Sequence, residues 1–213
     1  FLIGVGLVTI FSILSENDLF AMVSEDEFVY HELTYTDTEI SVFDFDFENR
    51  DIVVRPSEDG NITVMFYSND KDVMTVTDDS ETLSIINDIE WYNRIFIGWD
   101  FLFNREYYQV IVYLPSTENY TFKAESSNGK LDVMNIPNFN ILDMSTSNGV
   151  IHMTDVEAYK MTFDSSNGEA RLTDVLCATD IKLSTSNGRV YLTNVTGTKI
   201  DAHSSNGRII ATG

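Results

Sequence analysis

The sequence predicts an all-β fold, a parallel β-solenoid with coils of about 20 residues that follows a more irregular β region. Two observations support this prediction. A tripeptide returns at an almost fixed interval through the second half of the chain, and apolar residues alternate with polar residues on both sides of it. Such a period is typical of solenoids, in which each repeat forms one coil stacked on the previous coil.

The repeated tripeptide is Ser-Asn-Gly, which occurs five times with 19 or 20 positions between successive Asn residues. Gly and Asn tolerate a positive φ better than other residues, so we expect each tripeptide to form a turn whose Gly has φ > 0. A ladder of such turns can also bind a ligand, but a structural role is favoured. The predicted turn ladder consists of Asn128, Gly129, Asn148, Gly149, Asn167, Gly168, Asn187, Gly188, Asn206 and Gly207.

The residues around each tripeptide alternate in polarity. In the third repeat, Met161 and Phe163 precede Asn167 by six and four positions, and Ala170 and Leu172 follow it by three and five. This period of two is typical of strands, so each coil is expected to hold two short strands. A second polar column, seven positions after each Asn, predicts the other corner of the coil and consists of Asn135, Asp155, Asp174 and Asn194.

These repeats have the form Ser/Thr-Ser-Asn-Gly-x-Φ-x-Φ-x-Asn/Asp-Val, in which Φ is apolar. The pattern resembles the bacterial putative-adhesin family of β-strand-repeat envelope proteins, a domain family of unknown function, over residues 38–213. The resemblance implies a right-handed, single-stranded β-helix in an envelope protein. It brings no catalytic residues with it.

Composition restricts the partners that the chain can bind. The net charge of −21 is concentrated in residues 1–122, which carry −19, whereas residues 123–213 carry −2. Such a field disfavours nucleic acid and anionic lipid headgroups, and is compatible with divalent cations or basic surfaces. A simpler explanation of this negative charge is that it keeps the protein soluble. The single cysteine, Cys177, excludes an intrachain disulfide.

The chain divides into four segments. Residues 1–15 begin with the charge-free run FLIGVGLVTIFSIL, which lacks an initiator Met and is too short to span a bilayer, so a truncated transmembrane anchor or signal segment is expected. Residues 16–37 are expected to form a polar acidic tether, and their lack of Lys and Arg suits the outer side of a membrane. An N-terminal β region at 38–120 precedes the Ser-Asn-Gly repeats at 121–213, which break off partway through a coil.

The N-terminal β region contains one candidate metal site and several strands. Phe alternates with acidic residues so that Asp44, Asp46 and Glu48 occupy adjacent outward positions. Carboxylates so placed are possible Ca²⁺ ligands, but no calcium-loop motif is present, and a solvated strand face without any cofactor is favoured. Further strands are expected at 52–55, 62–67, 73–77, 83–86 and 107–114.

An aromatic insertion at residues 89–105 interrupts this region and holds both tryptophans of the chain. If exposed, its aromatic side chains form a stacking platform for sugars or a membrane-interface patch. If buried, they close the open end of the solenoid, because solenoids need caps. The cap is the favoured interpretation. The residues that define the binding alternative are Trp91, Tyr92 and Trp99.

An outward column on successive coils offers the one enzyme-like arrangement. Four positions after each Asn stand Asp132, His152, Arg171 and Tyr191. Such side chains resemble the acid–base groups of β-helix polysaccharide lyases and hydrolases. Mixed charges also occur on any soluble solenoid, and the repeats lack the insertions that enclose a cleft. Only a deep groove lined by these residues would favour catalysis.

The sequence therefore predicts a non-enzymatic, membrane-tethered surface interaction module whose β domain lies on the extracytoplasmic side of a bacterial envelope. An unknown surface protein or glycan is the expected partner, with the membrane contacted through the N-terminal segment and nucleic acid excluded. Two alternatives are an accessory protein of envelope stress sensing and a carbohydrate-active β-helix enzyme.

Overall fold

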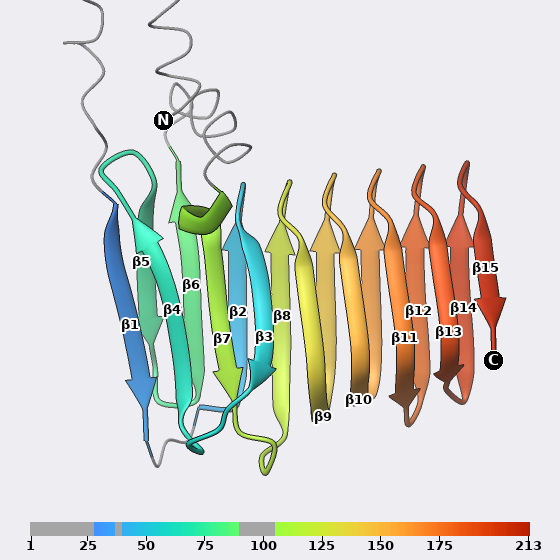
Figure 1. The fold of residues 1–213 in the computed structure, drawn as a ribbon, viewed down its shortest axis with the longest axis horizontal. Helices are drawn as coiled ribbons and strands as arrows, with labels where there is room; N and C mark the ends of the chain where they lie inside the picture. Colours follow the sequence, from blue (N-terminus) through green and yellow to red (C-terminus); the bar gives the residue numbers. More distant parts are fainter. Residues whose placement is uncertain (1–27, 37–39, 90–104) are drawn as a thin grey trace, which may run out of the picture.

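The computed structural model describes residues 28–36, 40–89 and 105–213, and in this part of the chain strands coil around one apolar core (Figure 1). The strands are β1 (Val29–Tyr35), β2 (Val42–Phe47), β3 (Asp51–Pro56), β4 (Ile62–Ser68), β5 (Val73–Asp78), β6 (Thr82–Asp88), β7 (Gln109–Leu114), β8 (Tyr120–Ser126), β9 (Leu131–Thr146), β10 (Ile151–Ser165), β11 (Ala170–Cys177), β12 (Asp180–Thr185), β13 (Val190–Thr196), β14 (Lys199–Ser204) and β15 (Ile209–Thr212). A 3₁₀ turn, η2 (Arg105–Tyr108), precedes β7.

The strands form two faces of a flattened solenoid. The first sheet has the order β1-β4-β7-β3-β9-β10-β11-β13-β15. The second sheet runs β5-β6-β2-β8, continues through the second halves of β9 and β10, and ends with β12 and β14. Successive coils pair in parallel and progress as a right-handed helix from left to right in Figure 1. The predicted all-β solenoid is confirmed.

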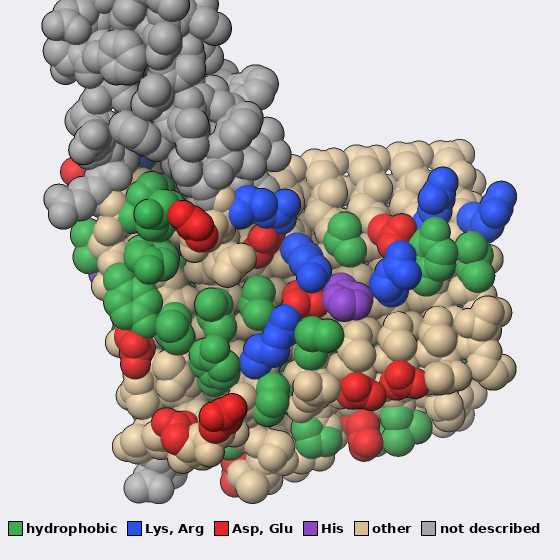
Figure 2. Space-filling view, in the orientation of Figure 1, with side chains coloured by type: hydrophobic (Ala, Val, Ile, Leu, Met, Phe, Trp, Pro, Cys, Tyr) green, Lys and Arg blue, Asp and Glu red, His purple; other side chains and the backbone are tan. Residues whose placement is uncertain are grey.

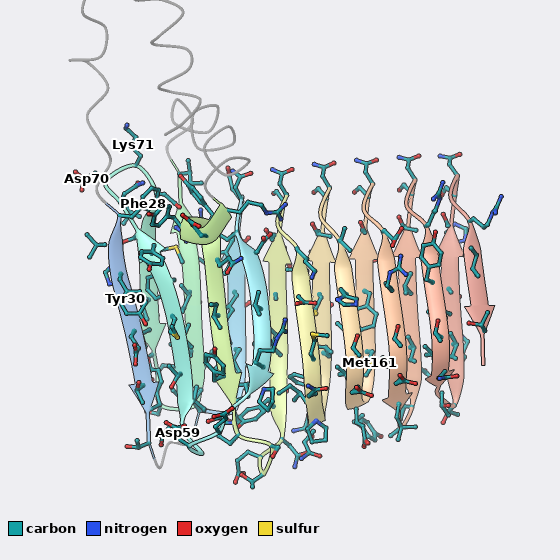
Figure 3. The ribbon with its side chains drawn as sticks, in the orientation of Figure 1. Phe28, Tyr30, Asp59, Asp70, Lys71 and Met161 are labelled. Atoms are coloured by element: carbon teal, nitrogen blue, oxygen red, sulfur yellow. The ribbon has the colours of Figure 1, made fainter. Side chains whose placement is uncertain are left out.

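The core lies between the two sheets and is filled by matching rows of apolar side chains. Burial alternates along each strand, as the period of two predicted. One fully buried row from the second sheet consists of Phe43, Phe122, Leu142, Met161 (labelled in Figure 3) and Ile181. The facing row from the first sheet consists of Ile52, Leu131, Ile151, Ala170 and Val190.

The second corner of the coil carries the left-handed backbone conformation. Asn135, Asp155, Asp174 and Asn194 have φ values of 58°, 53°, 53° and 51°. Asn and Asp enter this region more readily than other non-glycine residues, so one residue per coil turns the chain from the first sheet to the second. The polar column predicted at this corner is therefore confirmed.

The first coil begins earlier in the chain than the Ser-Asn-Gly repeats do. Asn128 Nδ2 donates to Asn49 Oδ1 over 2.7 Å, so Asn49 continues the column of turn asparagines. Phe47 and Arg50 stand where the later coils have Ser or Thr and Gly, which is why the tripeptide pattern misses this coil. The buried residues at the same spacing around Asn49 are Phe43, Phe45, Ile52 and Val54.

The coils are not stacked in sequence order. After β2 and β3 the chain forms β4 and β5, and it then adds β6 and β7 as a coil on the N-terminal side of the first one. β2 consequently pairs in parallel with both β6 and β8, and β3 with both β7 and β9. The irregular region expected at 38–120 thus contains two coils of the solenoid.

Antiparallel strands cover the N-terminal end of the stack. β4 pairs with β7, β5 with β6, and β1 with β4. The tether expected at 16–37 is therefore wrong for residues 29–35, which form β1 because Leu33 and Tyr35 pack against the core. Among the described residues no helix is long and apolar enough to cross a membrane, and residues 1–15 lie outside that part of the chain.

A buried ion pair joins this cap to the first coil. Arg50 Nη2 contacts the carboxylate of Asp72, and both side chains are fully buried. Arg50 Nη1 also donates to the carbonyl of Tyr107 over 3.3 Å, and Asn87 Nδ2 donates to Asp72 Oδ1 over 2.9 Å. Burial lowers the pKa of the Arg50 guanidinium, and the Asp72 carboxylate opposes that change. The pair thus links β3, the β4–β5 turn and β6.

Candidate functional site

The turn asparagines form a continuous hydrogen-bonded column along one edge of the solenoid, seen as a row of amide groups in Figure 3. Each Nδ2 donates to the Oδ1 of the preceding coil. The distances are 2.8 Å from Asn148 to Asn128, 2.8 Å from Asn167 to Asn148, 2.7 Å from Asn187 to Asn167 and 2.8 Å from Asn206 to Asn187. The column fixes the spacing and orientation of the coils from Asn49 to Asn206 at this edge.

The glycines of the turns have a different role from the one expected. None of Gly129, Gly149, Gly168, Gly188 and Gly207 has a positive φ, so the expectation of φ > 0 at these positions is wrong. Glycine is needed because an added Cβ would lie 1.5–1.8 Å from the carbonyl oxygen of the coil below. The preceding Ser or Thr hydroxyl accepts a hydrogen bond from each Gly N–H, for example 2.9 Å from Gly168 N to Ser165 Oγ.

The outward column on the first sheet is also in register. Asp132, His152, Arg171 and Tyr191 lie beside one another on β9, β10, β11 and β13. His152 Nδ1 lies 2.7 Å from Asp132 Oδ1, and the Arg171 guanidinium lies 4.5 Å above the Tyr191 ring. Sequence spacing therefore placed these four side chains correctly on one row.

Two cations and one histidine contact the carboxylate of Asp132. Arg55 contacts its carboxylate, and Lys130 Nζ lies 3.2 Å from Oδ1, while the Asp132 side chain is only 6% exposed. Burial raises the pKa of this carboxyl, but the hydrogen bonds from Arg55 and His152 outweigh burial and hold it below its ordinary value. An ionised carboxylate in this state suits an ion-pair network more than proton transfer, which needs a pKa near the working pH.

The model of the family described as Toastrack DUF4097 matches residues 40–213. The chain belongs to the Toastrack DUF4097 family. No curated protein sequence matches the chain.

Two solved structures resemble this Toastrack domain. A "putative cell adhesion protein" from Clostridium sporogenes has a TM-score of 0.54 and 10% sequence identity, over 88% of this chain and 99% of that one. A "putative adhesin" from Bacteroides fragilis has a TM-score of 0.42 and 14% identity, over 89% of this chain and 98% of that one. At such low identity the first likeness concerns the fold alone.

The acidic face of β2 was the candidate Ca²⁺ site. In the Toastrack domain the Phe side chains of β2 point inward and Asp44 and Asp46 outward, as predicted, whereas Glu48 follows the end of the strand. Lys123 Nζ lies 3.3 Å from Asp44 Oδ1. Burial raises the pKa of Asp46, and the charge of Glu125 adds a smaller increase. Within residues 28–36, 40–89 and 105–213 no group of three or more His, Cys, Asp or Glu side chains could hold a metal ion. The described geometry gives the Ca²⁺ alternative no support.

The tentative binding residues Trp91, Tyr92 and Trp99 lie outside the described residues. The described ends of that insertion, Ile89 and Arg105, adjoin an aromatic cluster that the sequence did not predict. Phe28, labelled in Figure 3, stacks on Tyr107 with ring centroids 4.5 Å apart, and Tyr67 meets Tyr107 edge-on at 5.2 Å. These residues come from distant positions in the sequence, so no local pattern brings them together.

A shallow depression of about 580 Å³ lies on the first sheet beside the asparagine column. Arg189 precedes β13 and Arg208 precedes β15, and the hydrogen bond of 2.9 Å from Val190 N to the Arg208 carbonyl joins the two coils. The residues that line the depression are Asn187, Arg189, Tyr191, Asn206, Gly207, Arg208 and Ile210. The sequence shows these arginines two positions after Asn, but it gave no signal that they share a depression.

Proposed function

We propose that this chain is a non-enzymatic, membrane-tethered surface interaction module, a rigid solenoid that presents a flat sheet to partners outside the cell. The observation that supports this function most directly is the first sheet itself. Over β9, β10, β11 and β13 it presents outward side chains in straight rows, with one residue from each coil, while hydrophobic side chains gather over β1, β4 and β7 (Figure 2). A surface so regular and preorganised suits binding, because little conformational entropy is lost when a partner docks.

The contacts of the outward row favour binding over catalysis. Asp132 is already bonded to Arg55, Lys130 and His152, and the nearest carboxylate to Arg171, that of Glu169, is bonded to it over 2.6 Å. These side chains satisfy one another, whereas a glycosidase pair needs one carboxyl group that holds a proton at the working pH. The name of the Clostridium sporogenes relative, a "putative cell adhesion protein", agrees with this proposal.

An attachment assay tests the proposal. Beads carry the 213-residue chain through an N-terminal tag and are washed over bacterial and animal cells under flow. Beads with a Gly168→Ala/Gly188→Ala chain, whose turns are disrupted, serve as the control. We expect the native chain to retain more beads than the control on at least one cell type. Equal retention by native, disrupted and uncoated beads would contradict an interaction role.

The location of the domain needs its own experiment. We expect protease added to intact bacteria to cut the β domain, because the tether places it outside the membrane. Protection in intact cells, with cleavage only after lysis, would reject the extracytoplasmic placement.

A further inference from the structure

Among the described residues, the outward cations of the second sheet are all lysines, whereas the first sheet carries arginines together with Lys130. Figure 2 shows Lys and Arg side chains together in a band across the first sheet of an otherwise acidic protein, and four arginines lie on this sheet. They are Arg55, Arg171, Arg189 and Arg208. The outward cations of the second sheet are lysines, namely Lys123, Lys160, Lys182 and Lys199. Arginine presents a planar fork of donors that matches a carboxylate, whereas lysine presents a point charge.

Arg189 and Arg208 differ from the other two arginines in their contacts with carboxylates. Arg55 and Arg171 each contact a carboxylate of the chain, those of Asp132 and Glu169. Arg189 and Arg208 form no salt bridge with any described residue, although both are exposed. They lie one coil apart and line the same depression. The depression therefore offers two guanidinium groups, on adjacent coils, that form no salt bridge with a described residue.

The other lining groups suit hydroxyl-bearing ligands. In the column Asn187 donates one amide hydrogen and accepts one hydrogen bond, and Asn206 donates one amide hydrogen, so each amide keeps further capacity for hydrogen bonds. Tyr191 contributes a phenol whose ring is held in place by Arg171 at 4.5 Å. Paired guanidinium groups, amides and one aromatic ring together fit a sugar that carries a carboxylate.

We propose that this depression binds the uronic-acid units of an acidic polysaccharide. Arg189 and Arg208 hold the carboxylate, and the asparagine amides contact ring hydroxyls. The inference rests on the proposed role as a surface interaction module and names its ligand class. The depression belongs to residues 123–213, which carry −2, so this half of the chain repels an anionic ligand less than residues 1–122 do, which carry −19.

Affinity electrophoresis of the 213-residue chain, kept in mild detergent, tests the site in gels that contain polygalacturonate, uncharged dextran or poly-glutamate. We expect retardation by polygalacturonate only. Arg189→Gln/Arg208→Gln should raise the apparent Kd at least about tenfold, since charge-assisted hydrogen bonds are lost. Lys182→Gln/Lys199→Gln removes the same charge from the second sheet and should change Kd by less than about twofold. Arg189→Lys/Arg208→Lys keeps the charge without the fork and should be intermediate.

Three results would overturn the site: no retardation of the native chain by polygalacturonate, equal loss in the arginine and lysine variants, or stronger retardation by poly-glutamate, which would indicate an acidic protein partner. Thermal unfolding of each variant checks that it is folded. If native beads still attach to cells while polygalacturonate fails to bind, the ligand assignment is wrong and the interaction role stands. If attachment itself fails, the interaction role is wrong.

Discussion

Replacing Gly168 with Ala should destabilise the solenoid strongly, although its backbone conformation is one that alanine accepts. The new Cβ would lie 1.5 Å from the Gly149 carbonyl oxygen and 2.9 Å from Ser165 Oγ. Carbon and oxygen atoms need more than 3 Å, so the coils must separate by roughly 2 Å at this edge. The two nearest atoms, the carbonyl oxygen and carbon of Gly149, belong to the backbone, so no side-chain rotation relieves the contact.

Such a separation breaks specific bonds. Asn167 N donates to the Ser147 carbonyl over 2.8 Å, and Asn167 Nδ2 donates to Asn148 Oδ1 over 2.8 Å. Neither bond survives a displacement of this size. Two lost hydrogen bonds cost about 1 kcal/mol each, and the strain of overpacking adds about 1–3 kcal/mol, so we expect a loss of about 3–5 kcal/mol in the free energy of unfolding.

Two other glycines serve as matched controls in urea unfolding followed by circular dichroism. At Gly197 an added Cβ meets its nearest atoms at 3.4 Å, so Gly197→Ala should change stability by less than about 0.5 kcal/mol. At Gly60 there is open space but φ is 79°, so Gly60→Ala should cost about 1–2 kcal/mol through backbone strain alone. If Gly168→Ala costs no more than Gly60→Ala, the close approach of coils is not what selects glycine.

Three further predictions concern buried polar groups, each measured by urea unfolding. Arg50→Met should cost about 3–5 kcal/mol by leaving Asp72 buried without a counter-charge, and adding Asp72→Leu should recover part of that loss; additive losses would contradict the pairing. Tyr120→Phe should be neutral or stabilising by up to about 1 kcal/mol, because the Tyr120 hydroxyl is buried without a partner among the described residues. Burial raises the pKa of Tyr120 to about 12, with a smaller contribution from the charge of Glu118. The native chain should therefore lose stability relative to Tyr120→Phe as pH rises above 10, and an equal pH dependence of unfolding free energy in both chains would refute this. Asp132→Asn should cost about 1–3 kcal/mol at pH 7. The cost should shrink as pH falls below about 4, because the neighbours that lower the pKa of Asp132 stabilise only its ionised form; a cost independent of pH would reject the ion-pair account.

The fold was predictable wherever the coils repeat the same requirements. Each repeat needs the same turn, the same inward residues and the same left-handed corner, so the period identified the solenoid and placed Asp132 beside His152. The reason for the turn glycines was not predictable, because freedom in φ and absence of a Cβ select the same residue. Only the distance from Gly168 to the Gly149 carbonyl separates the two explanations.

The N-terminal half was harder to predict because its contacts are distant in sequence. Arg50 occupies a glycine position and contacts Asp72, a residue on another turn. β2 lies between β6 and β8, so the neighbours of a strand do not follow from chain order. The depression shared by Arg189 and Arg208 could not be foreseen either, since spacing gives a row of residues but not the shape of the surface between them.

The asparagine column also has an electrical polarity. Every amide from Asn206 to Asn128 donates toward the preceding coil, so the side-chain dipoles align along the axis, as backbone dipoles do in an α-helix. The positive end of this stack lies at Asn49, and its negative end lies at Asn206. Residues 1–122, with their net charge of −19, contain the positive end. The negative charge of this half of the chain therefore interacts favourably with the positive end of the asparagine column.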